Sequence, residues 1–282
     1  MKTTRTFFST ALALAAAVML SAPVAVRADT LVSNWTFSEA SQTTLNLSAN
    51  TGAGWGGAGT TWDVAIPGLA TNGSGLLNVR NSGGGGSGTR TAYADFGPVT
   101  SQITTGTVSL YASFASWNLA GAGASGPRLT LALVEGNDFT TAQFSLAANA
   151  AGVTLSGGVD PSGNGVALAS TALFTPARQT PLTVRVVANL GLLSYSVDYD
   201  AGAGWVTLGS AQVDSLTAGI NSARLSLSGD FSIGAQADRG LAVDRIWVVE
   251  GPVAAIPEPG AGWMLLFGLA VVAAARRQHG RA

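Results

Sequence analysis

Hydrophobic and polar residues alternate with a period of two along most of the chain between residues 30 and 250. The alternation is clearest in five stretches, 108–114, 129–133, 182–188, 193–199 and 223–227. Shorter stretches of the same character lie at 31–37, 76–80, 91–96, 142–147, 153–156, 205–208 and 241–249. Because successive side chains of a β-strand point to opposite faces, this period predicts strands that are buried on one face. No window in this region has a convincing helical period, so the sequence predicts an all-β domain.

Turn sequences separate the predicted strands. Residues 189–192 and 200–204 each join two alternating stretches and predict β-hairpins. Four consecutive glycines at 83–86 predict a flexible loop. We find no internal repeat of about 20–50 residues, which argues against a propeller or a solenoid. About a dozen short strands at this spacing predict an antiparallel, jelly-roll-like β-sandwich.

The first 28 residues have the features of a secretory signal peptide. Lys2 and Arg5 are basic, residues 7–20 are apolar apart from two hydroxyl side chains, and a Val-Arg-Ala sequence ends at Ala28. We therefore expect export and cleavage after Ala28 by signal peptidase. The alternative is a buried N-terminal helix, which explains the apolar run but not the charge and the cleavage sequence.

The C-terminus carries a second sorting sequence with three parts. In order, these are Pro257, Glu258 and Pro259, the 16-residue apolar stretch 260–275, and Arg276 and Arg277. A helix that crosses a bilayer unaided needs about 20 residues. Local thinning of the bilayer or snorkelling of the arginines would still allow this stretch to span. The alternatives are a plain C-terminal anchor, a buried core helix and a processed tail of another kind.

Over residues 256–281, these parts and their order resemble the PEP-CTERM signal of Gram-negative bacteria. The resemblance implies recognition by an exosortase, a polytopic membrane protease, after the C-terminal helix has entered the inner membrane. It also implies delivery to the outer membrane surface or extracellular matrix of a bacterium that makes exopolysaccharide. Ile256 in place of the common valine, and His279 and Gly280 in the basic tail, depart from the pattern.

Residues 182–249 resemble the C-terminal half of concanavalin A-like (laminin-G-like) jelly rolls. The resemblance rests on the order of the strands and on a closing strand that contains Asp244, Arg245 and Ile246. It carries no chemical signature, so it implies the fold alone. The chain divides into a signal peptide (1–28), a β-sandwich domain (29–252) and a PEP-CTERM sorting segment (253–282).

Composition excludes several kinds of site from the domain. The chain has no cysteine, its single lysine is Lys2, and its single histidine is His279. The domain therefore cannot build a Ser-His-Asp or Cys-His arrangement, a His/Cys zinc site or a Schiff-base lysine. Residues 29–255 contain 14 acidic and 8 basic side chains, a formal charge of −6, so nucleic acid is not expected as a partner.

Carboxylates are the catalytic groups that remain. Glycoside hydrolysis needs two carboxyl groups that face one sugar bond, and laminarinase-like jelly rolls place them in a Glu-x-Asp-x-x-Glu string, which is absent here. Asp198 and Asp200 alternate onto one strand face and are the nearest approach to a pair. Their position before a glycine-rich turn favours solvated turn residues. We therefore expect a protein that is not an enzyme.

The sequence offers oxygen ligands of the kind that bind calcium. Asp160 and Asn164 lie in a loop with the alternate spacing of a calcium site, and Asp138 follows a Gly-Asn sequence. The loop lacks a second carboxylate and a terminal glutamate, and the closing of tight turns explains the same residues. Calcium is the one cofactor that the sequence suggests.

Tryptophans are the candidate ligand-binding residues. Trp55 and Trp62 lie in or beside a glycine-rich segment, where an aromatic ring either stacks on a sugar or plugs one end of the sandwich. The other tryptophans of the domain lie on or beside strands and are expected in the core; they are Trp35, Trp117, Trp205 and Trp247.

These observations predict an exported, non-enzymatic protein of the cell envelope or extracellular matrix that associates with exopolysaccharide or biofilm. The alternative is a carbohydrate-binding module that uses Trp55 or Trp62, or exposed Asp and Asn side chains that bind calcium. A carboxylate-based glycosidase or lyase is the third hypothesis.

Overall fold

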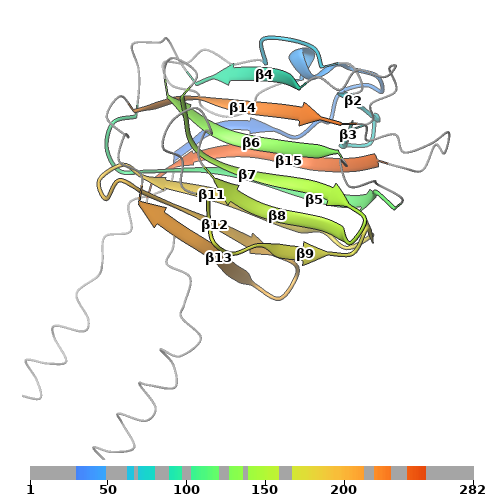
Figure 1. Ribbon diagram of the computed structural model, residues 1–282. Helices are drawn as coiled ribbons and strands as arrows, with labels where there is room; N and C mark the ends of the chain where they lie inside the picture. Colours follow the sequence, from blue (N-terminus) through green and yellow to red (C-terminus); the bar gives the residue numbers. More distant parts are fainter. Residues whose placement is uncertain are drawn as a thin grey trace, which may run out of the picture.

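The computed structural model describes residues 30–48, 62–66, 69–79, 89–96, 103–120, 127–135, 139–158, 167–212, 219–229 and 240–251. These residues form two antiparallel sheets that pack face to face (Figure 1). The predicted signal peptide and the predicted C-terminal helix lie outside the described residues. The one helical element of the described ranges is the short 3-10 helix η1 (Leu45–Leu47).

The nine-stranded sheet, here called the large sheet, has the order β13-β12-β11-β5-β15-β3-β2, with β1 paired to β15 and β10 paired to β5. Its strands are β1 (Thr30–Trp35), β2 (Leu69–Thr71), β3 (Leu77–Val79), β5 (Thr107–Asn118), β10 (Ala177–Arg178), β11 (Leu182–Asn189), β12 (Ser194–Asp200), β13 (Trp205–Gln212) and β15 (Gly240–Glu250).

The six-stranded sheet, here called the small sheet, has the order β4-β14-β6-β7-β8-β9. Its strands are β4 (Arg90–Asp95), β6 (Arg128–Glu135), β7 (Phe139–Asn149), β8 (Gly152–Gly158), β9 (Ala172–Phe174) and β14 (Ile220–Ser228). It lies in front of the large sheet in Figure 1.

The core lies between the sheets and follows the alternation of the sequence. On β5, for example, Val108, Leu110, Ala112 and Phe114 are fully buried. Phe114 meets Phe144 of the small sheet edge-to-face, with ring centroids 6.5 Å apart. The prediction of an antiparallel jelly-roll-like sandwich is confirmed, and each predicted strand has a counterpart.

Both predicted hairpins are present. β11 and β12 are joined through 190–193, and β12 and β13 are joined through 201–204. Strands β2, β9 and β10 were not predicted, because elements of two or three residues are too short to show a period.

Strand register places several chain segments at one end of the large sheet. Asn189 pairs with Thr107 on β5, and Glu250 pairs with the adjacent Val108. Thr30 pairs with Glu250 on the other side of β15. The hairpin tip 190–193 therefore lies at the same end as the close of the last strand, on the left in Figure 1, where the β13 arrow ends.

Candidate functional site on the outer face of the large sheet

A row of aromatic and charged side chains crosses the outer face of the large sheet. Its members pair directly across five neighbouring strand-strand contacts; from β1 to β13 they are Asn34, Trp247, Tyr111, Arg185, Asp198 and Thr207. Because paired residues of neighbouring strands point to the same face, these side chains form one continuous line. We call it the aromatic row.

The β1 side of the row is organised around Trp247. Tyr111 stacks on its ring with centroids 4.8 Å apart and planes 8° from parallel. The Arg245 guanidinium carbon lies 4.5 Å from the same ring, and Arg245 Nε donates to Asn34 Oδ1 at 2.6 Å. Trp247 is therefore held between a stacked phenol from β5 and a guanidinium that is anchored on β1.

The β13 side of the row is a buried ion pair beneath a tryptophan. Arg185 Nε donates to Asp198 Oδ2 at 2.8 Å, and both residues are almost fully buried, at 5% and 3% exposure. The Arg185 guanidinium carbon lies 4.3 Å from the Trp205 ring centroid, and Trp205 meets Tyr111 edge-to-face at 6.1 Å. The ion pair thus fixes Arg185, and Arg185 in turn supports the indole of Trp205.

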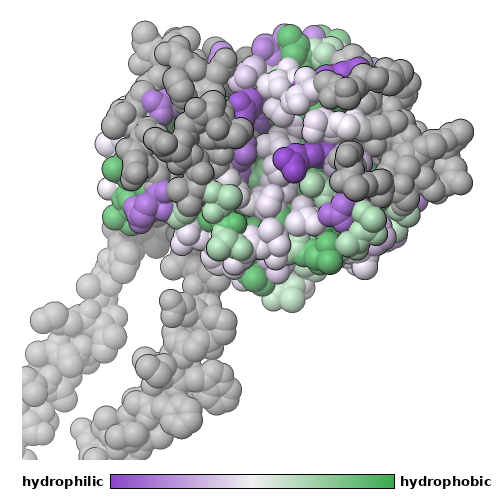
Figure 2. Space-filling model, viewed as in Figure 1, coloured by the Kyte–Doolittle hydropathy of each residue, from purple (hydrophilic) through white to green (hydrophobic). Residues whose placement is uncertain are grey.

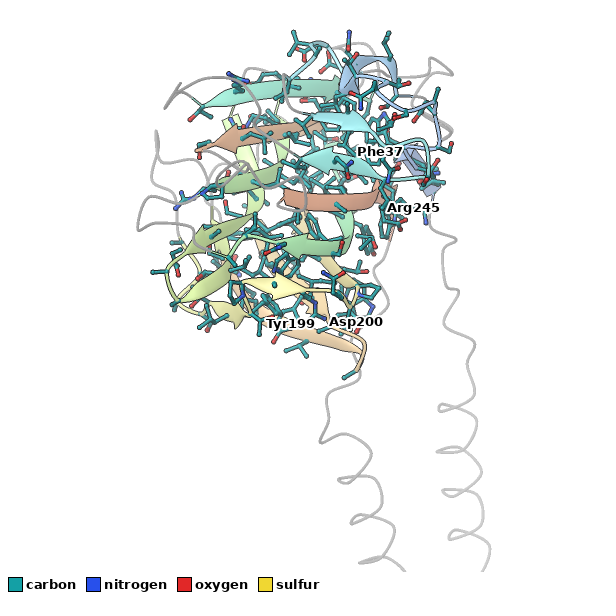
Figure 3. All side chains as sticks on the ribbon, turned by 90° about the vertical axis from the view of Figure 1, so that its right-hand side faces the viewer. Phe37, Tyr199, Asp200 and Arg245 are labelled. Carbon is teal, nitrogen blue, oxygen red and sulfur yellow. The ribbon has the colours of Figure 1, made fainter. Side chains whose placement is uncertain are left out.

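Arg245 and Trp205 lie at the two ends of a second line of paired residues beside the aromatic row. Register pairs Arg245 with Ser113, Ser113 with Thr183, Thr183 with Asp200 and Asp200 with Trp205. Small side chains therefore separate the two large ones. Figure 3 shows the labelled Arg245 at about mid-height on the right of the molecule and Asp200 below it.

The expectation that all strand tryptophans belong to the core is wrong for Trp205 and Trp247. Both are partly exposed, on the outer face, whereas Trp35 and Trp117 are buried. Alternation gives the reason for Trp247, since its neighbours Ile246 and Val248 are both fully buried and the residue between them must point outward. Trp205 is the first residue of β13, at the edge of the large sheet.

Of the two tryptophans that the sequence proposed for ligand binding, Trp62 is packed inside. It is 1% exposed, and its ring centroid lies 4.9 Å from that of Trp35. Its position agrees with the packing alternative and leaves no ring face for a sugar. Trp55 lies outside the described residues.

Asp198 and Asp200 share one face of β12, as predicted, but they do different things. Asp198 was expected to be solvated, and that expectation is wrong because the residue is buried in its ion pair with Arg185. Asp200 closes the hairpin turn, since its Oδ1 accepts from the backbone N–H groups of Gly202 and Gly204 at 2.8 and 3.0 Å. Neither carboxylate is placed to face the other across a substrate.

A second pair of carboxylates lies at the edge of the small sheet: Asp95 is the last residue of β4, and Asp63 lies in the segment beside that strand. Burial raises the pKa of Asp95 above its ordinary value, and the neighbouring charge of Asp63 raises it further. Asp63 Oδ1 accepts from the Tyr93 backbone N–H at 2.8 Å, next to the edge strand β4. Both residues remain exposed to solvent, so the desolvation of Asp95 is only partial.

The candidate calcium ligands Asp138, Asp160 and Asn164 lie outside the described residues. Within the ranges that are described, no group of three or more Asp, Glu or His side chains could hold a metal ion. The same ranges contain no helix of the length and apolarity needed to cross a bilayer.

The outer face of the small sheet has a different character from the aromatic row. Figure 2 shows the face over this sheet as mostly pale, with isolated hydrophilic residues. Register places hydroxyl side chains side by side there: Thr91 and Ser226 are 3.2 Å apart, and Thr130 and Ser145 are 2.8 Å apart. These hydroxyls satisfy one another, so this face has less to offer a ligand than the aromatic row.

The C-terminal residues that resembled a sorting signal match a known family. The PEP-CTERM protein-sorting motif matches residues 255–281. The chain carries a PEP-CTERM sorting motif. This motif implies an exported protein that is sorted through the membrane and processed by an exosortase. The sorting residues Pro257, Glu258, Pro259, Arg276 and Arg277 fall within the match and outside the described residues. No curated protein matches the chain significantly.

The comparison with solved structures finds similar proteins at low sequence identity. The CBM2 module of the Lactobacillus casei BL23 phage J-1 evolved Dit has a TM-score of 0.51 and 10% identity, over 82% of this chain and 99% of that one. The endo-1,3-β-glucanase from Streptomyces sioyaensis has a TM-score of 0.48 and 16% identity, over 82% and 100%. Peanut lectin has a TM-score of 0.39 and 13% identity, over 70% and 92%. At 10% identity, the likeness to the first of these concerns the fold alone.

Proposed function

We propose that this protein is an exported, non-catalytic polysaccharide-binding protein of the cell envelope or extracellular matrix. The observation that carries the proposal is the aromatic row together with the adjacent Trp205. On one sheet face they present the partly exposed rings of Trp205, Tyr111 and Trp247, and the partly exposed Arg245 guanidinium lies beside Trp247. Aromatic rings bind the apolar faces of sugars, and guanidinium groups bind their hydroxyl or carboxylate oxygens.

The dimensions of the row favour a polymer over a small sugar. From β15 to β13 the row covers four strand-to-strand steps, about 19 Å at about 4.8 Å a step. A single monosaccharide would touch one ring, whereas an extended chain could touch several. The PEP-CTERM motif supports the same conclusion, because an exported protein meets polysaccharide at the cell surface.

Trp205 is the ring that we expect to contribute most. Among the described strands, β13 is the edge of the large sheet, so none of them lies beside Trp205 on its outer side. Its position is fixed from below by Arg185, which is itself fixed by Asp198. A ring that is already held in place loses little conformational freedom on binding, which favours affinity.

The absence of catalysis is supported by the available side chains. Residues 29–255 contain no histidine, cysteine or lysine. Of the described carboxylates near the aromatic row, Asp198 is committed to Arg185 and Asp200 to the hairpin turn. Purified protein should therefore release no oligosaccharide from a polysaccharide that it binds. Release that is abolished by changing one Asp or Glu would refute this part of the proposal.

The proposal is tested by substituting Trp205. In affinity electrophoresis, exopolysaccharide in the gel should slow the migration of Trp205→Ala less than that of the parent protein. We expect the affinity to fall about tenfold, because stacking and apolar contact are both lost. Val206→Ala is the matched control, since Val206 is adjacent on β13 and 47% exposed but pairs with Tyr199 on the inner side. Equal loss for both variants, or binding by neither the parent protein nor the control, would contradict the proposal.

A further inference from the structure

The tip of the β11–β12 hairpin exposes two leucines. Leu192 is 68% exposed and Leu193 is 38% exposed, while Leu190 at the start of the turn is buried at 5%. Turns of this kind usually present polar residues or glycine to water. Two adjacent exposed leucines at a hairpin tip therefore call for a partner.

Hydrogen bonds hold this tip in one shape. The Leu192 N–H donates to Asn189 Oδ1 at 3.0 Å, and the Leu190 N–H donates to the Gly106 carbonyl at 2.9 Å. In the orientation that satisfies both of its amide atoms, the Gln212 nitrogen donates to the carbonyl oxygens of Leu192 and Leu193 at 3.0 and 3.2 Å. The leucines are thus presented by a built turn.

Backbone conformation makes the choice of leucine more informative. Leu193 has φ +49°, in the left-handed region, where glycine and asparagine are the favourable residues. A leucine at this position costs stability and exposes apolar surface at the same time. Such a residue is expected where its side chain makes a contact outside the domain.

The position of the tip identifies the partner. Gly251 N–H donates to the Thr107 carbonyl at 3.0 Å, and Asn189 pairs with the same Thr107. The point where the chain leaves β15 and the base of the hairpin tip are therefore about 10 Å apart, two strand spacings. The sorting motif begins four residues later, at 255, and its apolar stretch covers 260–275.

We propose that the hairpin tip is a membrane contact: Leu192 and Leu193 enter the interface of the bilayer that holds the C-terminal apolar segment. Residues 252–259 connect the end of β15, beside the hairpin tip, to the C-terminal apolar segment. These eight residues reach at most about 28 Å. This tether gives the tip a high local concentration at the bilayer, so two leucines suffice where a free domain would dissociate. The proposal rests on the sorting motif and is independent of polysaccharide binding.

The distribution of charged residues on the large sheet indicates that the contact with the bilayer is apolar rather than electrostatic. Glu250 is the charged side chain at this end of the sheet within the described residues, and the described arginines of the sheet lie farther along its strands; they are Arg178, Arg185 and Arg245. Neutral phosphatidylcholine should therefore serve as well as anionic lipid, and added salt should have little effect.

The absence of cysteine allows a direct test in the full chain. The full chain with Leu192→Cys carries a nitrobenzoxadiazole label and is reconstituted in phosphatidylcholine vesicles, with and without spin-labelled lipid. We expect about a twofold or larger rise in emission on reconstitution and strong quenching by the spin-labelled lipid. Val206→Cys is the control, since Val206 is 47% exposed near the opposite end of β13.

Leu193→Asn in the labelled Leu192→Cys chain separates membrane contact from folding. Asparagine suits the left-handed backbone, so the melting temperature should stay the same or rise, while quenching at position 192 should fall. Equal quenching at 192 and 206, no quenching at 192, or failure of the full chain to float with vesicles would each overturn the proposal. Quenching that requires anionic lipid and disappears with salt would overturn it as well.

Discussion

Removing the carboxylate of Asp198 should destabilise the protein far more than removing an ordinary surface charge. Arg185 and Asp198 are buried, their atoms are 2.8 Å apart, and Trp205 lies over the guanidinium. Without the carboxylate, Arg185 would keep a buried charge that water cannot reach without displacing the indole. The aromatic row depends on this pair, because the pair holds Trp205 in position.

The expected magnitude follows from burial. Breaking a buried ion pair by removing one partner costs about 3–5 kcal/mol, whereas an exposed pair contributes about 0–1 kcal/mol. Asp198→Asn keeps the size of the side chain and one hydrogen-bond acceptor, and the contact of Arg185 with Trp205 remains. We therefore expect the lower end, about 3 kcal/mol, which for a domain of this size is a fall of about 6–12 °C in Tm.

Urea unfolding followed by tryptophan fluorescence measures this effect. The control is Asp200→Asn, two residues away on the same face, which keeps the Oδ1 acceptor of its turn and should lose less than about 1 kcal/mol. The double replacement Arg185→Met with Asp198→Leu should recover most of the loss, because an apolar pair replaces a buried ion pair without leaving a charge. A loss below about 1 kcal/mol for Asp198→Asn would show that Arg185 reaches water and would refute the packing described for the row.

Three further predictions concern groups away from the row. Burial raises the pKa of Tyr195 to about 12. Stability should therefore be maintained below pH ~10, the ordinary tyrosine pKa, and fall as pH rises through ~12; unfolding followed by tyrosinate absorbance measures this, and Tyr195→Phe should remove part of the fall. The pKa of Asp95 is raised by burial and by Asp63, so its contribution to stability should be present below its unfolded pKa, about 3.9, and be lost as pH rises through the folded value. An NMR titration should show a lower pKa for Asp95 in Asp63→Asn, and an unchanged pKa would contradict the assigned cause. Trp62→Ala should lower the free energy of unfolding in urea by about 3–5 kcal/mol, because Trp62 packs on Trp35 in the core. Its polysaccharide affinity should be retained; a selective loss of binding would show that Trp62 contacts the ligand.

The architecture could be predicted from the sequence because it depends on a local signal. A period of two is repeated along each long strand, and glycine-rich turns punctuate it, so strands and hairpins follow without knowledge of the partner strands. Strand β9 is the counterexample, since Ala172–Phe174 is too short to establish any period.

The aromatic row could be predicted only in part. The turn at 190–193 fixes the β11–β12 register, which sets Arg185 opposite Asp198, so the ion pair follows from a local feature. The contact between Tyr111 and Trp247 joins strands β5 and β15, which are distant in sequence. Nothing local specifies that pairing, and the row therefore became visible only with the fold.

Tryptophan as a residue type was a poor guide to its own position. Large aromatic residues are mostly buried, which led to the expectation of a core role for Trp247. The position within the alternation was the better guide, because Ile246 and Val248 occupy the inner face on either side. Strand parity should therefore take precedence over residue type when candidate binding residues are chosen from a β-rich sequence.

Calorimetric titration with exopolysaccharide tests the central claim, that the outer face of the large sheet is the binding surface, most directly. The parent protein and Val206→Ala should bind with equal affinity, and Trp205→Ala should bind about tenfold more weakly with its fold intact by circular dichroism. Undiminished affinity in Trp205→Ala would contradict the account.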